Sequence, residues 1–136
     1  MAEITKIVIT KNPVYGCSPF MFQEKITLTA NSIEYKLIPH MNNKRDTEIH
    51  WKYQSNSDAV KDKIKEAFDE FGKIVWLDED AKCFDIGSLE FAITYSDRTE
   101  FNKSYRRPPT DFRDGLIVIK GLIPHTEQMP IFFECL

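Results

Sequence analysis

The chain has 136 residues, of which 42% are apolar and 29% charged, and 18 basic against 21 acidic side chains give a net charge of −3. These values are typical of one globular domain and exclude a fibrous or wholly disordered chain. The near balance of charge argues against generic attraction to nucleic acid, and without an apolar stretch of bilayer length or a basic leader we expect a cytoplasmic protein with no membrane partner.

The first part of the chain is predicted to contain a strand, a hairpin and a further strand, and the last two form an antiparallel meander. Residues 4–10 are rich in β-branched side chains and predict a strand, which a loop containing Pro, Gly and Asn follows. Within residues 25–37, apolar and polar side chains alternate on both sides of a turn at Asn31 and Ser32, which predicts a hairpin. The alternation resumes at residues 49–53, where we expect a third strand.

A first helix is expected between Ser57 and Gly72. Ser55 or Ser57 is a suitable N-cap, and Gly72 is a natural end. One face of this helix is apolar at the required spacing: Val60, Ile64, Ala67, Phe68 and Phe71. The apolar run at residues 74–77 after it fits either a short strand or a buried crossing.

A second hairpin and a second helix follow. Residues 90–95 alternate, a turn is expected at Ser96, Asp97 and Arg98, and the return strand begins at Phe101. Pro108 and Pro109 end that strand, Thr110 is a suitable N-cap, and Pro124 ends the helix. The apolar stripe of this helix is Phe112, Leu116, Ile119 and Leu122 or Ile123.

Together these elements predict a single α+β domain spanning residues 1–136. Strands with one apolar face and two amphipathic helices form two layers when both helices pack on the same side of the sheet. We therefore expect an antiparallel sheet of about five or six strands with two helices on one face. The order of hairpin and helix occurs twice, but the two halves share too little identity to be a true repeat.

The best candidate for a binding site is a basic cluster before and within the second predicted helix: Lys103, Tyr105, Arg106, Arg107 and Arg113. Guanidinium groups bind carboxylates or phosphates at two points, and the first N–H groups of a helix attract anions. The alternative, which we rank first, is that these are exposed charges of an edge strand that discourage pairing between molecules.

Nucleic-acid binding through this cluster is an alternative to protein binding. Single strands require exposed aromatic side chains for stacking, but Phe101 and Phe112 fall at core positions and leave only Tyr105. We therefore rank nucleic acid below protein as a partner.

The sequence predicts neither a metal site nor a cofactor. His40, His50 and His125 show no HxH or HExxH spacing, and the five glycines form no phosphate-binding loop. The three cysteines are odd in number and widely separated, which fits reduced thiols. A cysteine-dependent enzyme centred on Cys17, with His125 or His50 as its base, is the third hypothesis.

The segments KITLTANSIEYKLIP, LEFAITYSDRTEF and GLIPHTEQMP occur in an order that resembles a group of small bacterial α+β proteins with no assigned activity. The resemblance spans residues 3–131, and its motifs are structural, so it implies no functional residue.

We expect a non-enzymatic protein-binding module, of the accessory or inhibitory kind that mobile elements and defence-related loci encode. This hypothesis rests on small size, many charges and the lack of catalytic or cofactor motifs in the sequence.

Overall fold

A computed structural model describes residues 3–12, 22–39, 48–74, 89–105 and 112–124 of the chain. Predictions that concern Pro108, Pro109, Thr110 and most of the run at residues 74–77 lie outside the described residues. The described strands and helices are β1 (Ile4–Lys11), β2 (Phe22–Thr29), β3 (Ser32–Pro39), β4 (Ile49–Gln54), α1 (Asp58–Gly72), β5 (Leu89–Tyr95), β6 (Glu100–Tyr105) and α2 (Phe112–Leu122).

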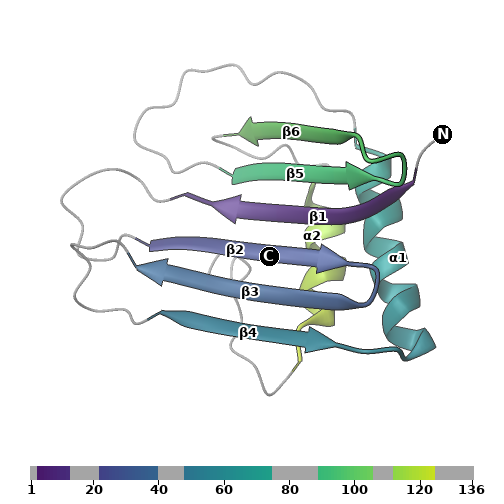
Figure 1. Ribbon diagram of the computed structural model, residues 1–136, viewed down its shortest axis with the longest axis horizontal. Helices are drawn as coiled ribbons and strands as arrows, with labels where there is room; N and C mark the ends of the chain where they lie inside the picture. Colours follow the sequence, from purple (N-terminus) through teal and green to yellow (C-terminus); the bar gives the residue numbers. More distant parts are fainter. Residues whose placement is uncertain (1–2, 13–21, 40–47, 75–88, 106–111, 125–136) are drawn as a thin grey trace.

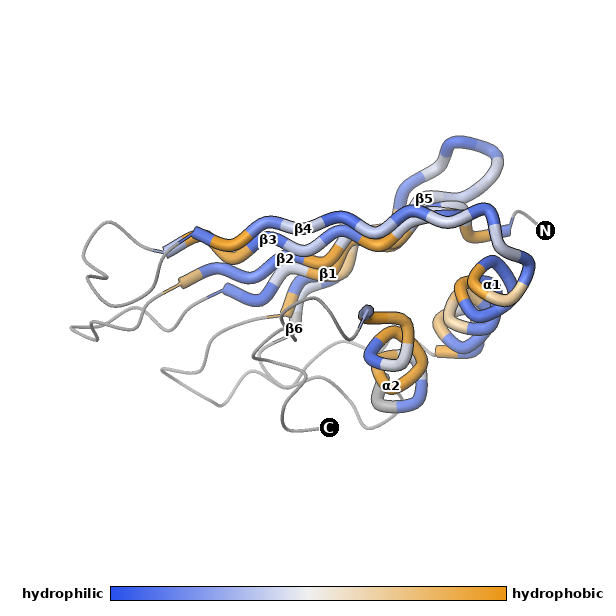
Figure 2. The backbone as a smooth tube through the Cα atoms, turned by 90° about the horizontal axis from the view of Figure 1, so that it is seen from below, coloured by the Kyte–Doolittle hydropathy of each residue, from blue (hydrophilic) through white to orange (hydrophobic). Residues whose placement is uncertain are grey.

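The six strands form one open sheet in the order β4-β3-β2-β1-β5-β6, and every neighbouring pair is antiparallel (Figure 1). β1 lies inside the sheet, between β2 and β5. Both helices lie on the same side of the sheet (Figure 2). The predicted fold class, a two-layer α+β domain with two helices on one face of an antiparallel sheet, is confirmed.

The core lies between the sheet and the helices. Most of the apolar residues that face the helices from β4 to β5 and the centres of both helix stripes are at most 8% exposed, including Ile7, Ile26, Tyr35, Ile64 and Ile119. Val60, Phe68 and Leu122 of the stripes are partly buried against this core. Burial of these side chains is the main favourable term in folding. The period-two and helical patterns of the sequence therefore predict the core correctly.

The helices pack closely because α2 has a glycine where it meets α1. A Cβ atom at Gly115 would lie 2.7 Å from Cε2 of Phe71. The Phe71 ring packs in turn on Phe91 of β5, with a centroid distance of 6.0 Å and an interplanar angle of 46°. Gly115, Phe71 and Phe91 thus connect both helices to the sheet.

The two hairpin turns differ in their agreement with the sequence. The first occupies Ala30 and Asn31, one position earlier than predicted, because Ser32 already pairs with Thr29 in the ladder. The second turn follows the prediction, and Arg98 there has a φ of 70°. The Arg98 N–H donates to the Tyr95 carbonyl at 2.9 Å, which is the arrangement of a three-residue hairpin loop with a left-handed third residue.

The start of α1 is predicted correctly, but the expected capping bond is absent. Ser57 is the N-cap residue, yet its side chain makes no cap hydrogen bond. Instead, the Ser57 N–H donates to Oγ of Ser55 at 3.1 Å. Neither α1 nor α2 is long and apolar enough to cross a membrane.

Candidate binding surface on the open face of the sheet

The sheet face opposite α1 and α2, here called the open face, carries the polar residues that alternate with the core. No described helix covers it (Figure 2). Because side chains alternate along a strand, the registers place one residue in two of each strand on this face. Its central residues are Lys6, Val8, Thr10, Lys25, Thr27, Glu34, Lys36, His50, Lys52, Glu90, Ala92, Asn102 and Ser104.

Each strand from β4 to β1 contributes one lysine to the open face. We call these four residues the lysine belt: Lys52 of β4, Lys36 of β3, Lys25 of β2 and Lys6 of β1. Lys36 is half-buried and the other three are exposed. Four neighbouring strands at a spacing of about 4.8 Å make the belt roughly 14 Å wide across the strands. Along the strands, Lys6 is level with Thr29, four residues or about 13 Å from the level of Lys25 and Lys36. A chain of net charge −3 thus concentrates positive charge on one half of one face.

Two lysines of the belt stand directly opposite each other. Lys25 and Lys36 are cross-strand partners, and Lys36 also faces His50 on its other side. Like charges in directly opposite positions destabilise a sheet. Ion pairs join His50 to Glu34, Lys63 to Glu66 and Lys73 to Glu70, and none of these three pairs includes a lysine of the belt.

Glu34 is the carboxylate that β1 to β4 place on the open face within the described residues, and it is already engaged. Its Oε2 lies 2.9 Å from Nε2 of His50 on the neighbouring strand. This hydrogen bond, followed by the charges of Lys36, His50 and Lys52, holds the pKa of Glu34 below its ordinary value, and partial burial opposes the shift. Glu34 therefore stays ionised.

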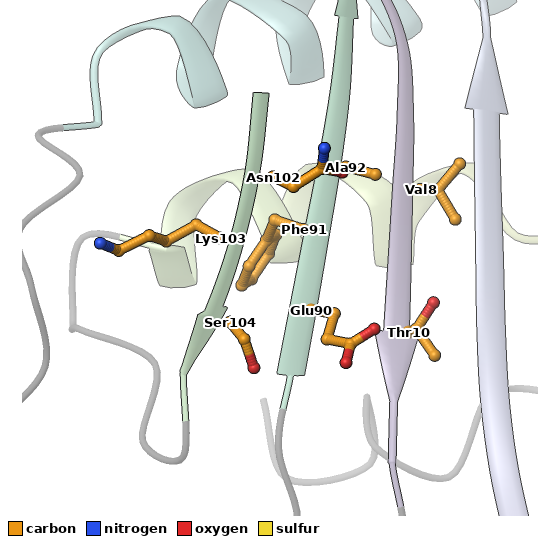
Figure 3. A pocket seen from close by; sticks show the side chains of 8 residues that line it. All are labelled: Val8, Thr10, Glu90, Phe91, Ala92, Asn102, Lys103 and Ser104. Atoms are coloured by element: carbon orange, nitrogen blue, oxygen red, sulfur yellow. The ribbon is translucent and has the colours of Figure 1, made fainter. Parts of the chain in front are cut away.

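The open face has two shallow depressions. One, of about 230 Å³, has Lys6, Lys25, Lys36 and Glu34 around Val8 and Thr27. The other, of about 380 Å³, lies over β1, β5 and β6 between Thr10, Glu90, Asn102 and Ser104 (Figure 3). Both are open to solvent and suit contact with a surface or an extended chain better than enclosure of a small molecule.

The structure tests the predicted basic cluster only in part. Lys103 lies on β6 opposite Phe91 at the rim of the larger depression, and its side chain extends outward from the edge strand (Figure 3). Tyr105 and Arg113 belong to β6 and α2, but only their backbones are described, and Arg106 and Arg107 lie outside the described residues. Convergence of the five residues on one site stays a prediction.

The face of the sheet that the helices cover carries a buried polar pair, Tyr35 and Glu24. The Tyr35 hydroxyl donates to Oε2 of Glu24 at 2.6 Å, and both residues are 1% exposed. Lys11 pairs with Glu24 across β1 and β2, and burial lowers the pKa of its ammonium group while the Glu24 charge opposes the shift. No substrate can reach the carboxylate or the phenol, so we interpret the pair as a polar anchor within the core.

The sequence contains a signal for the buried Glu24–Tyr35 pair and, in part, for the lysine belt. Glu24 stands in phase with Ile26 and Leu28 and therefore had to face the helices. The lysines of the belt stand in the opposite phase, but their gathering depends on which strands are neighbours. That order, with β1 next to β2, is not visible in the alternation.

The described residues include no group of three His, Cys, Asp or Glu side chains that could hold a metal ion. Cys17, His125 and the other two cysteines lie outside the described residues, so the cysteine hypothesis is not tested. Comparison of the sequence with protein-family models and with curated proteins found no match. The resemblance to small bacterial α+β proteins stays a prediction.

Proposed function

We propose that this protein is a cytoplasmic, non-enzymatic protein-binding module and that the open face of its sheet is the binding surface. The observation that carries the proposal is the lysine belt on a sheet face that no described helix covers. Like charges gathered on a broad, shallow surface are suited to a macromolecular partner of opposite charge.

The size of the open face supports this use. Six strands of six to eight residues present a surface of roughly 600 Å², from strand spacings of about 4.8 Å and rises of about 3.3 Å per residue. A standard protein–protein interface buries about 800 Å² on each partner. The open face alone supplies about three quarters of that area, so a specific complex of standard size would also use its rim.

The chemistry of the described polar groups also favours binding over catalysis. General acid or base catalysis requires a titratable group within hydrogen-bond reach of the substrate. Glu24 is enclosed, and Glu34, which solvent does reach, is held ionised by His50. Neither arrangement is that of a proton-transfer group poised near neutral pH.

Site-specific photocrosslinking in the native host tests the proposal. p-Benzoylphenylalanine replaces Thr27 or Ala92 on the open face in two variants, and the matched control carries it at the exposed Lys65 of α1. We expect both open-face variants to give the same protein adduct, sensitive to protease and resistant to nuclease, and the control to give none.

Two outcomes would contradict the proposal. An adduct that nuclease removes would identify nucleic acid as the partner. If neither Thr27 nor Ala92 gives an adduct in cells that contain the folded protein, the open face is not a binding surface.

A further inference from the structure

We propose that the lysine belt binds an acidic polypeptide segment, rich in Asp and Glu, that crosses strands β1 to β4 in extended form. This inference rests on the proposed function and specifies the chemistry of the partner. The belt extends roughly 14 Å across the strands and about 13 Å along them, so a segment that crosses it obliquely needs about six residues in extended form, at about 3.3 Å per residue.

The first argument is that the belt carries more charge than the fold uses: Lys36 and Lys52 attract the single carboxylate of Glu34, whereas Lys25 stands opposite another lysine. Lys25 and Lys36 are opposite each other, an arrangement that weakens the β2–β3 pair. Neutral polar residues at these positions would cover the face equally well without repulsion. A ligand whose carboxylates lie between Lys25 and Lys36 would explain why the chain keeps two opposed lysines that lower its stability.

The second argument concerns the neighbouring groups of opposite charge. Glu34 accepts its hydrogen bond from His50 and is the cross-strand partner of Lys52. The single charge of Glu34 cannot balance four ammonium groups. The described open-face carboxylates of the remaining strands are Glu90 on β5 and Glu100 on β6, away from the belt. The excess positive charge of the β1 to β4 half therefore complements an acidic ligand.

The third argument distinguishes a polypeptide from a single-stranded nucleic acid. Sequence-tolerant binding of single strands uses aromatic side chains on which the bases stack. In the described strands the apolar residues on the open face are Val8, Ile38 and Ala92, and none is aromatic. The belt also uses lysine, a point charge, where two-point binding of phosphate favours arginine. A surface with small aliphatic side chains and lysine ammonium groups is therefore better suited to the carboxylates of an extended polypeptide than to a nucleic acid.

Fluorescence anisotropy with defined probes tests the inference. The probes are a labelled ten-residue peptide of alternating Glu and Ser, the same peptide with Gln in place of Glu, and a twelve-nucleotide oligothymidylate. We expect the Glu peptide to bind most tightly and its affinity to fall as the salt concentration rises from 50 to 200 mM.

Two double variants with equal change in net charge locate the site. Lys25→Gln with Lys36→Gln removes the opposed pair, and Lys61→Gln with Lys65→Gln removes two exposed lysines of α1. From the usual contribution of exposed charge pairs, we expect the first to weaken binding of the Glu peptide by about tenfold and the control by less than about twofold. The first variant should also unfold at a higher temperature than the unmodified protein, since the cross-strand repulsion is gone.

The inference is overturned if oligothymidylate binds more tightly than the Glu peptide, or if both double variants weaken binding equally, which would indicate a net-charge effect alone. It is also overturned if the Glu and Gln peptides bind equally. If the Glu peptide fails but photocrosslinks at Thr27 and Ala92 still identify a protein, the proposed function stands and only the acidic character of the partner is wrong.

Discussion

Gly115 of α2 provides a sharp test of how the two helices pack. A Cβ atom there would lie 2.7 Å from Cε2, 2.9 Å from Cδ2 and 3.2 Å from Cζ of Phe71. Ordinary contacts between carbon atoms are about 3.5–4.0 Å. The Phe71 ring is fully buried and packs against Phe91, so it cannot turn aside without disturbing β5. Gly115→Ala must therefore move α2 or force the ring from its position.

The expected effect combines two opposing terms. Overpacking of a filled core costs about 1–3 kcal/mol. Replacing Gly by Ala inside a helix gains about 1 kcal/mol. We expect Gly115→Ala to destabilise the protein by about 1 kcal/mol net. Gly121→Ala, in the same helix with no atom within 4 Å of the added Cβ, has only the favourable term and should stabilise it.

Urea unfolding followed by circular dichroism measures both variants. A difference of about 2 kcal/mol between them corresponds to a midpoint difference of about 1 M at a typical slope. Adding Phe71→Leu to Gly115→Ala should recover part of the loss, because leucine lacks the ring atoms that the Cβ meets. Equal midpoints for the two alanine variants would refute the close approach of α1 and α2 at Gly115.

Three further predictions concern two polar contacts and one backbone conformation. Tyr35→Phe removes the hydrogen bond to the buried Glu24 carboxylate and should destabilise the protein by about 1.5–3 kcal/mol in urea unfolding; a loss below about 0.5 kcal/mol would contradict the anchoring role. Because the folded-state pKa of Glu34 is depressed, its contribution to stability is present above the unfolded pKa and is lost as the pH falls through the folded value. His50→Ala should raise the Glu34 pKa, measured by carboxyl ¹³C NMR titration, and an unchanged titration would show that His50 is not the main cause. Arg98→Gly should stabilise the second hairpin by up to about 1 kcal/mol, since only glycine adopts a φ near 70° freely, and a lower thermal midpoint would contradict this reasoning.

The strands and helices were predictable because their burial follows simple periods. Ile7 and Ile9, or Ile64, Ala67 and Phe71, are spaced as one face of a strand or helix requires, and that face is buried in the structure. The side of the sheet on which the helices lie follows from the same patterns.

Contacts between elements were not predictable in the same way. The fit of Gly115 against Phe71 depends on where two helices cross, and a glycine in a helical pattern is compatible with many other roles. The belt similarly required knowledge that β1 and β2 are neighbours.

The candidate site illustrates the same limit. Arg106 and Arg107 were predicted to belong to a binding site because they are adjacent in the sequence, and a sequence shows clustering only along the chain. The lysine belt gathers residues from four strands, and its members Lys6 and Lys52 are separated by two hairpin strands. Charge that is assembled by a sheet can be found in sequence only after the strand order is known.

The inner position of β1 has a consequence for synthesis on the ribosome. β1 is made before the other described strands, yet one of its two neighbours, β5, emerges much later: the Thr5 hydroxyl donates to the Thr94 carbonyl, 89 positions further along the chain. At a translation rate of about 5–20 residues per second, the edge of β1 waits several seconds for its partner. During that time Ile7 and Ile9 belong to an unpaired strand edge, the kind of edge that joins nascent chains to one another. The nascent chain is therefore most exposed to edge-to-edge association between the emergence of β1 and that of β5.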